Sequence, residues 1–210
     1  MKKLLLQLDT DRLPSAFDAV VAYDAGVDHV LAYGGVTPDD VRGLVYGAIF
    51  TRGPKDLRNT AIFIGGAEVA AGEALLARAR ETFFGPFRVS CMLDSNGSNT
   101  TAVAAVVKLA RAAGGVEGKR VVVLAGTGPV GMRAAGLFAK AGARVRITSR
   151  DPSSGARAKA AVESRFGVSV DVSAVRYPLG RDPLVADADV VLASGPPGVA
   201  LLRREGWADG

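Results

Sequence analysis

A glycine-rich turn directly after a short apolar strand constrains this chain more than any other feature. Residues 120–125 are rich in valine and uncharged after Arg120, which is typical of a strand buried on both faces of a parallel sheet. A helical stretch over residues 130–140 follows the turn. This is the context that a dinucleotide-binding turn requires. The turn consists of Gly126, Thr127, Gly128, Pro129, Val130 and Gly131.

Each glycine of this turn has a separate expected role, and so has Pro129. Gly126 permits the tight turn, Gly128 lets the backbone approach a pyrophosphate, and Gly131 allows the helix to pack closely on the strand. Pro129 lies near the helix start, where its missing N–H costs little. The remaining N–H groups and the helix dipole favour an anion. We therefore predict a cofactor site, against the alternative of an ordinary glycine-rich turn.

The end of the next predicted strand indicates which dinucleotide binds. An NAD site usually carries Asp or Glu there, which accepts hydrogen bonds from the ribose hydroxyls. Here Ser149 and Arg150 offer a hydroxyl and a guanidinium, which suit the 2′-phosphate of NADP. Asp151 follows, where it either pairs with Arg150 or begins the next turn. Arg157 or Lys159 would add positive charge, so we predict NADP over NAD.

Strands and helices alternate along the whole chain, which predicts an α/β fold with parallel sheets and right-handed crossovers. The predicted strands are residues 4–8, 27–33, 60–64, 89–93, 120–125, 144–148, 168–175 and 190–193. The predicted helices are residues 15–25, 38–46, 67–82, 100–113, 130–140 and 153–166. A glycine-rich hinge at residues 114–118 divides an N-terminal domain, 1–115, from a Rossmann-like domain, 116–210.

Two polar segments at predicted strand ends are further site candidates. Ser194 and Gly195 follow the last predicted strand, where small residues let the backbone approach the nicotinamide ribose; the alternative is a plain proline–glycine turn. The loop over residues 94–101 holds seven polar side chains, more than one helix cap needs. Loops at the carboxyl ends of parallel strands are where such folds bind ligands. We therefore expect substrate contacts from Asp94, Ser95, Asn96 and Asn99.

Composition narrows the class of protein. With one cysteine and one histidine, the chain has no intrachain disulfide and no evident metal site, and a reducing cytoplasm is its natural compartment. No apolar run is long enough to cross a membrane. The net charge of +5 indicates an anionic partner or only arginine-rich surface helices. Nucleic acid is not expected, because the charge is dispersed and only 6% of residues are aromatic.

The chain resembles the NADP-dependent methylene-tetrahydromethanopterin dehydrogenases of methylotrophic bacteria, some of which also use methylene-tetrahydrofolate. The long irregular stretch over residues 83–101 is the most specific match. Further matching segments are residues 9–11, 14–18, 33–39, 51–53, 61–66 and 122–133. The resemblance covers residues 3 to 150 and is looser beyond.

The resemblance implies a homo-oligomeric enzyme of formaldehyde oxidation, with the pterin in the cleft between its two domains. A hydride would pass from the methylene carbon to C4 of NADP⁺. By the same resemblance, Phe17 offers a ring face to the pterin and Asp18 a hydrogen-bond acceptor, although Phe17 also suits the core of an amphipathic helix. Lys55 would steer an anionic pterin tail, or would only be solvated.

One departure from the family keeps other functions open. Its members run past residue 210, completing the sheet and returning a basic, histidine-containing helix, so we expect an incomplete second domain. One alternative is therefore an NADP-binding protein without turnover. A second is a shikimate- or quinate-type NADP dehydrogenase, which needs a Lys–Asp pair that does not stand out here.

Overall fold

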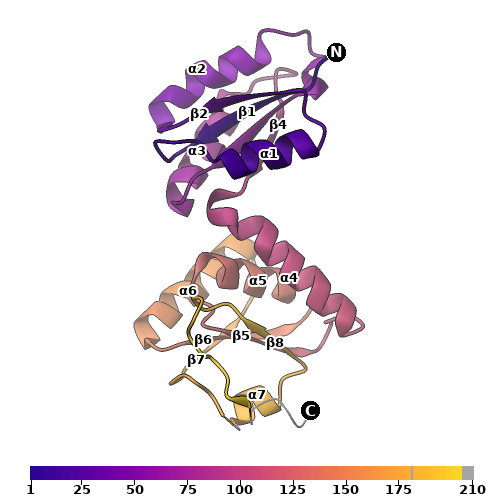
Figure 1. Cartoon of the computed structure of the whole chain (residues 1–210). Coiled ribbons are helices and arrows are strands. Elements are labelled where there is room, and N and C mark those ends of the chain that lie inside the picture. Colours follow the sequence, from indigo (N-terminus) through magenta and orange to yellow (C-terminus); the bar gives the residue numbers. More distant parts are fainter. Residues whose placement is uncertain (181, 205–210) are drawn as a thin grey trace. The chain divides into compact units, whose positions relative to one another are not determined.

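The computed structural model describes residues 1–180 and 182–204, which fall into two compact α/β units (Figure 1). The units are Met1–Gly97 and Ser98–Gly210, each built on a four-stranded parallel sheet. The predicted α/β fold with two parallel sheets is confirmed. Residues 205–210, which end the predicted second domain, lie outside the described residues.

In the first unit the strand order is β2-β1-β3-β4. Its strands are β1 (Leu4–Asp9), β2 (His29–Tyr33), β3 (Thr60–Gly65) and β4 (Ser90–Leu93). Its α-helices are α1 (Ala16–Asp24), α2 (Pro38–Ile49) and α3 (Val69–Thr82), and a 3₁₀ turn, η1 (Leu57–Asn59), precedes β3. A second 3₁₀ turn, η2 (Ser95–Gly97), ends the unit.

The core of the first unit follows the period-2 alternation of its strands. Leu6 and Leu8 of β1 and Ile62 and Ile64 of β3 are buried against α2 and α3. Helix α1 connects β1 to β2, which lies on the side of β1 opposite to β3. A right-handed connection in this direction places α1 on the face of the sheet opposite to α2 and α3. Only Ala22 of α1 is buried.

The second unit repeats the design with the strand order β7-β6-β5-β8. Its strands are β5 (Arg120–Leu124), β6 (Arg144–Ser149), β7 (Asp171–Ala174) and β8 (Val190–Ala193). Its helices are α4 (Ser98–Ala112), α5 (Pro129–Lys140), α6 (Pro152–Phe166) and α7 (Pro183–Ala186). Figure 1 shows α4, α5 and α6 on one face of this sheet and α7 on the other.

The observed boundary between the units differs from the predicted one after residue 115. Ala102 and Val106 of α4 pack in the same core as Val121 and Val123 of β5, so this helix belongs to the second unit. Val116, within the predicted hinge, is 4% exposed and joins that core. The glycine-rich segment is therefore an internal turn of the second unit. No helix within the described ranges is both long and apolar enough to span a membrane.

Candidate functional site

The glycine turn begins at the carboxyl end of β5 with a residue in an unusual conformation. Ala125 has a φ of 50°, in the left-handed region that L-residues rarely adopt. Its N–H donates to the Tyr177 hydroxyl at 2.7 Å and to Thr148 Oγ1 at 3.1 Å. The Gly126 N–H donates to the Thr148 carbonyl at 3.1 Å. These bonds fix the turn against β6 and against the loop after β7.

The three glycines of the turn differ in the space around them. A Cβ on Gly126 would lie 2.8 Å from Val123 Cγ1, and one on Gly131 would lie 2.6 Å from Gly126 Cα and from Ser194 Oγ. At Gly128, which caps α5 with a φ of −81°, a Cβ would meet nothing within 4 Å. Packing therefore requires glycine at 126 and 131, whereas Gly128 borders open space.

That open space is a hollow of about 410 Å³ at the carboxyl ends of β5, β6 and β8. Most of the predicted cofactor residues line it: Thr127, Gly128, Ser149, Arg150, Ser194 and Gly195. Gly126 and Gly131 pack beneath it, Pro129 occupies the first turn of α5, and Val130 packs toward the core. The structure thus brings the predicted cofactor residues to one place.

The side chains after β6 have distinct partners. Ser149 Oγ donates to the Asp151 carbonyl at 2.8 Å, whereas the Arg150 side chain is exposed and has no polar partner within the described residues. Asp151 begins the next turn as the N-cap of α6, so of our two alternatives the second is correct. Lys159 Nζ donates to the Val170 carbonyl at 2.6 Å, and this side chain does not line the hollow.

Two residues that hold the glycine turn and the start of α5 were not predicted from the sequence. Tyr177 lines the hollow from the loop after β7, and its hydroxyl also bonds Thr148 Oγ1. Arg133 of α5 is 5% exposed; its Nε donates to Asn99 Oδ1 at 2.5 Å and its Nη1 to the Pro129 carbonyl at 3.2 Å. Asn99, which we expected to contact substrate, is therefore tied to the start of the cofactor helix.

In the first unit, three carboxylates gather where strands β1 and β4 end. Asp9 is 1% exposed and accepts the N–H groups of Asp11 at 2.9 Å and Ser15 at 3.0 Å. Desolvation raises the pKa of the Asp18 carboxyl above its ordinary value, and the charges of Asp9 and Asp94 raise it further, while a Ser15 hydrogen bond opposes them. Asp9 therefore holds the loop after β1 and contributes to the charge beside Asp18.

The other predicted substrate residues differ in their exposure. Phe17 is 76% exposed, and Asn96, with a φ of 59°, donates from Nδ2 to the Ala67 carbonyl at 3.2 Å. Ser95 is 1% exposed and donates to the Gly65 carbonyl at 3.1 Å, so its burial corrects the expectation of a substrate contact.

Lys55 lies apart from these residues. It lies in the connection from α2 to the start of β3, and the neighbouring Arg52 bonds the carbonyls of Lys2 and Asn59, which precede β1 and β3. A connection from helix to strand reaches the amino edge of a parallel sheet, whereas Asp18 and Asp94 lie at the carboxyl edge. The structure therefore does not bring Lys55 to the carboxylates.

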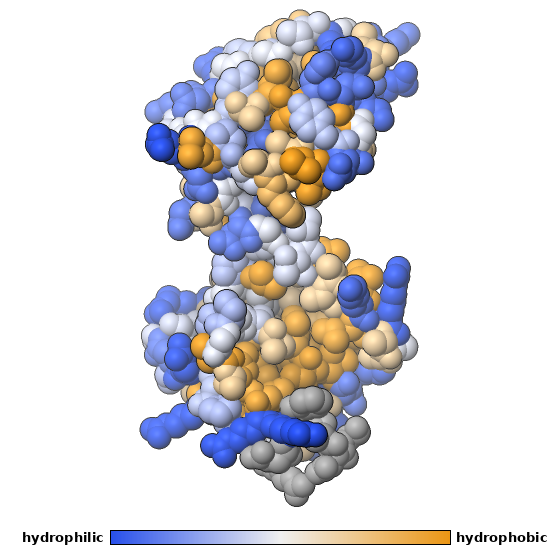
Figure 2. All heavy atoms as spheres, viewed as in Figure 1, coloured by the Kyte–Doolittle hydropathy of each residue, from blue (hydrophilic) through white to orange (hydrophobic). Residues whose placement is uncertain are grey.

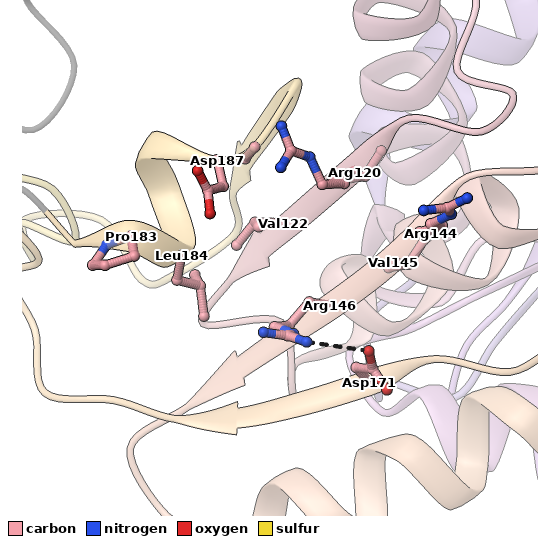
Figure 3. A pocket seen from close by; sticks show the side chains of 11 residues that line it. Arg120, Val122, Arg144, Val145, Arg146, Asp171, Pro183, Leu184 and Asp187 are labelled. Carbon is pink, nitrogen blue, oxygen red and sulfur yellow. Dashed lines mark hydrogen bonds and ion pairs between the residues drawn. The ribbon is translucent and has the colours of Figure 1, made fainter.

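A second hollow in the second unit, of about 370 Å³, lies near the amino ends of β5 and β6 (Figure 3). Three arginines line it, but Arg146 is paired with Asp171 at 3.3 Å and Arg120 with Asp189 at 3.6 Å. Parallel α/β sheets bind cofactors at the carboxyl edge, where helix N-termini present free N–H groups. We therefore assign the candidate cofactor site to the hollow at the glycine turn.

Fold and turn together define a class: α/β proteins whose second unit carries a dinucleotide-binding turn at the carboxyl edge of a parallel sheet. Residues 16–96 match the family model described as "Methylene-tetrahydromethanopterin dehydrogenase, N-terminal". Two relatives from Methylorubrum extorquens match nearly the whole chain. "Bifunctional protein MdtA" is 51% identical over 98% of this chain and 72% of its own length. "NAD(P)-dependent methylenetetrahydromethanopterin dehydrogenase" is 35% identical over 91% of this chain and 66% of its own.

The chain belongs to the methylene-tetrahydromethanopterin dehydrogenase family. It spans slightly less than two thirds of the second relative. Two solved structures share the fold alone. The ligand-free 5-ketofructose reductase of Gluconobacter sp. strain CHM43 has a TM-score of 0.59 at 18% identity, covering 98% of this chain and 76% of its own. Aspartate transcarbamoylase from Trypanosoma cruzi has a TM-score of 0.52 at 13% identity, covering 91% and 62%.

Proposed function

We propose that this chain is an oxidoreductase that transfers a hydride from methylene-tetrahydromethanopterin to NADP⁺, giving the methenyl form. The proposal depends above all on family membership: the 35% identical relative is named as this dehydrogenase, and the family model matches residues 16–96 of the first unit. Nothing in the hollow or the carboxylate group favours the shikimate- or quinate-type alternative.

The residues around the hollow fit an extended anionic dinucleotide. The start of α5 offers backbone N–H groups beside open space at Gly128, and Arg150 offers an unpartnered guanidinium for a 2′-phosphate. When bound, NADP⁺ supplies the carbon that accepts the hydride. We assign the pyrophosphate to the turn and the 2′-phosphate to Arg150.

The reaction demands alignment more than acid–base catalysis. The methylene carbon lies between two nitrogens whose lone pairs stabilise the cation left when the hydride departs, so no proton must move in that step. Binding and orientation therefore supply the protein's contribution. In the first unit we assign these tasks to Phe17, which presents an exposed ring, and to Asp18, which presents a half-buried carboxyl.

We further propose that the chain forms homo-oligomers through the first unit. Helix α1 and the edge strand β2 expose large apolar side chains, among them Val20 at 57%, Tyr23 at 51% and Leu31 at 44%. Figure 2 shows hydrophobic residues at the surface of the first unit over α1. Strand β2 lacks the charged residues and prolines that usually protect a sheet edge. Leu31→Lys should lower the molar mass seen by analytical ultracentrifugation; an unchanged mass would refute this surface.

We place the reaction in cytoplasmic one-carbon metabolism, as a step of formaldehyde oxidation. The single cysteine, which forms no intrachain disulfide, is compatible with a reducing compartment. Formaldehyde-derived carbon would enter the reaction as the methylene group on the pterin.

The test is to supply NADP⁺ with methylene-tetrahydromethanopterin, or with methylene-tetrahydrofolate, and to follow the absorbance of the reduced nicotinamide. A rate above the uncatalysed background is expected with at least one pterin. NADP⁺ binding without turnover would instead indicate a non-catalytic binding protein. Arg150→Ala should weaken NADP⁺ by about tenfold, the loss of one charge-assisted hydrogen bond, and leave NAD⁺ nearly unchanged. Equal weakening of the two dinucleotides would refute the 2′-phosphate assignment.

A further inference from the structure

An acidic side chain borders the proposed cofactor site and has to be reconciled with NADP. Asp151 lines the hollow next to Arg150, two residues after the end of β6, close to where NAD sites carry the acid that binds the ribose hydroxyls. A free carboxylate there would favour NAD⁺ and repel a 2′-phosphate. The inference below rests on the proposed function and concerns how this carboxylate is kept from that role.

The carboxylate of Asp151 is already occupied by its own helix. Oδ2 accepts three hydrogen bonds, from Ser153 Oγ at 2.7 Å, Ser154 N at 2.9 Å and Ser154 Oγ at 2.6 Å. Oδ1 accepts the Ser153 N–H at 3.2 Å. To accept hydrogen bonds from two ribose hydroxyls, each carboxylate oxygen needs a free lone pair. Oδ2 has none left, because it already accepts three hydrogen bonds. Asp151 therefore cannot bind a ribose as the acid of an NAD site does.

Arg157, one turn further along α6, holds both serines in this arrangement. Its Nη1 donates to Ser153 Oγ at 3.1 Å and its Nη2 to Ser154 Oγ at 2.8 Å. A guanidinium has only donors, so each hydroxyl accepts from Arg157 and directs its own hydrogen to Asp151. The arginine thus reaches the carboxylate through the two serines and offsets its charge.

The hydrogen bonds at the Asp151 carboxylate also affect its pKa. The four hydrogen bonds from Ser153 and Ser154 hold its pKa well below the usual range. The carboxylate stays ionised around neutral pH, and the serines remain bound to it.

We infer that Ser153 and Ser154 set the dinucleotide preference by occupying the Asp151 carboxylate, which leaves Arg150 to select the 2′-phosphate of NADP. The serines are specificity-determining residues that act through Asp151. Their removal should free the carboxylate for ribose hydroxyls, in the manner of an NAD site.

The test is the double variant Ser153→Ala/Ser154→Ala, which removes two hydroxyl donors and keeps both backbone N–H donors of the helix cap. The dissociation constants of NADP⁺ and NAD⁺ are measured by calorimetric titration of the whole chain. We expect the ratio of the two constants to move about tenfold toward NAD⁺, the effect of one charge-assisted hydrogen bond gained. Ser169→Ala is the matched control, because its hydroxyl bonds Glu163 at the far end of the same helix.

A second variant keeps the inference testable if the double variant is unstable. Asp151→Asn keeps one acceptor oxygen for the helix cap and removes the charge, so it should tighten NADP⁺ without improving NAD⁺. If the double variant still binds NADP⁺ and the ratio is unchanged, Asp151 is only a helix cap and the inference is overturned, while the proposed function stands. If the unaltered chain binds no NADP⁺, both are refuted.

Discussion

Replacing Gly131 by alanine should destabilise the second unit through a collision that the structure specifies. The new methyl carbon would lie 2.6 Å from Gly126 Cα and 2.6 Å from Ser194 Oγ, too close for either to accommodate it without a shift. Overpacking of this kind costs up to about 3 kcal/mol. Alanine's better helix propensity returns about 1 kcal/mol of this. The net loss of up to about 2 kcal/mol corresponds to a fall in the melting temperature of at most about 4–8 °C for a chain of this size.

Gly128→Ala is the matched control in the same turn. Its methyl carbon would meet nothing within 4 Å, and its φ of −81° suits any residue, so the melting temperature should hardly change. The methyl group would instead project toward the hollow in which we place the pyrophosphate. NADP⁺ binding should therefore weaken by about tenfold, the equivalent of a modest steric cost of about 1.4 kcal/mol.

Thermal unfolding and calorimetric titration separate the two outcomes. Gly131→Ala should lower the melting temperature of the ligand-free chain, whereas Gly128→Ala should lower only the affinity for NADP⁺. If the Gly131 variant melts like the unaltered chain, the close approach of α5 to Gly126 and Ser194 is wrong. If the Gly128 variant binds NADP⁺ normally, the pyrophosphate does not lie over this turn.

Three further outcomes follow from side chains described above. Because the pKa of Asp18 is raised, ionising this carboxyl destabilises the folded chain as pH rises through the folded-state pKa. Asp18→Asn should therefore raise the melting temperature at pH 7, and the difference from the unaltered chain should disappear near pH 4. A difference that does not depend on pH would contradict this prediction. Arg133→Met leaves Asn99 Oδ1 without its Nε donor and should cost about 1.5–3 kcal/mol in urea unfolding, whereas an unchanged midpoint would show that the buried bond is dispensable. Burial raises the pKa of the Cys91 thiol to about 11, so iodoacetamide should alkylate the folded chain at pH 8 about 100-fold more slowly than the urea-unfolded chain, and equal rates would refute the burial.

Local patterns predicted most of the fold, because short apolar strands and capped helices leave a signal in sequence. The predicted strand at residues 190–193 coincides with β8, and that at 144–148 is one residue shorter than β6. The predicted strand at residues 168–175 is longer than β7, because Val170 packs into the core before pairing with β6 begins at Asp171. Helix α7 has only four residues and no periodicity to detect.

The site was predictable only where one segment carries its chemistry. The glycine turn can be recognised from the sequence because its strand, turn and helix are contiguous. The contact of Tyr177 with Ala125 joins residues 52 apart, and that of Arg133 with Asn99 joins residues 34 apart, so no local pattern reports them. For Lys55, the charge alone suggested a contact with an anionic pterin tail. Its place before β3 puts it at the amino edge of the sheet, opposite to the edge where Asp18 and Asp94 lie.

The double duty of Asp151 has an evolutionary consequence. As the N-cap of α6, this residue stabilises the helix, and most substitutions would forfeit that stabilisation. Descendants of this chain adapting to a different nucleotide pool would lose helix stability by altering the acid itself. Mutations of the neighbouring serines leave the backbone donors of the cap in place. Positions 153 and 154 are therefore the ones at which sequence drift should accompany changes of cofactor among related proteins.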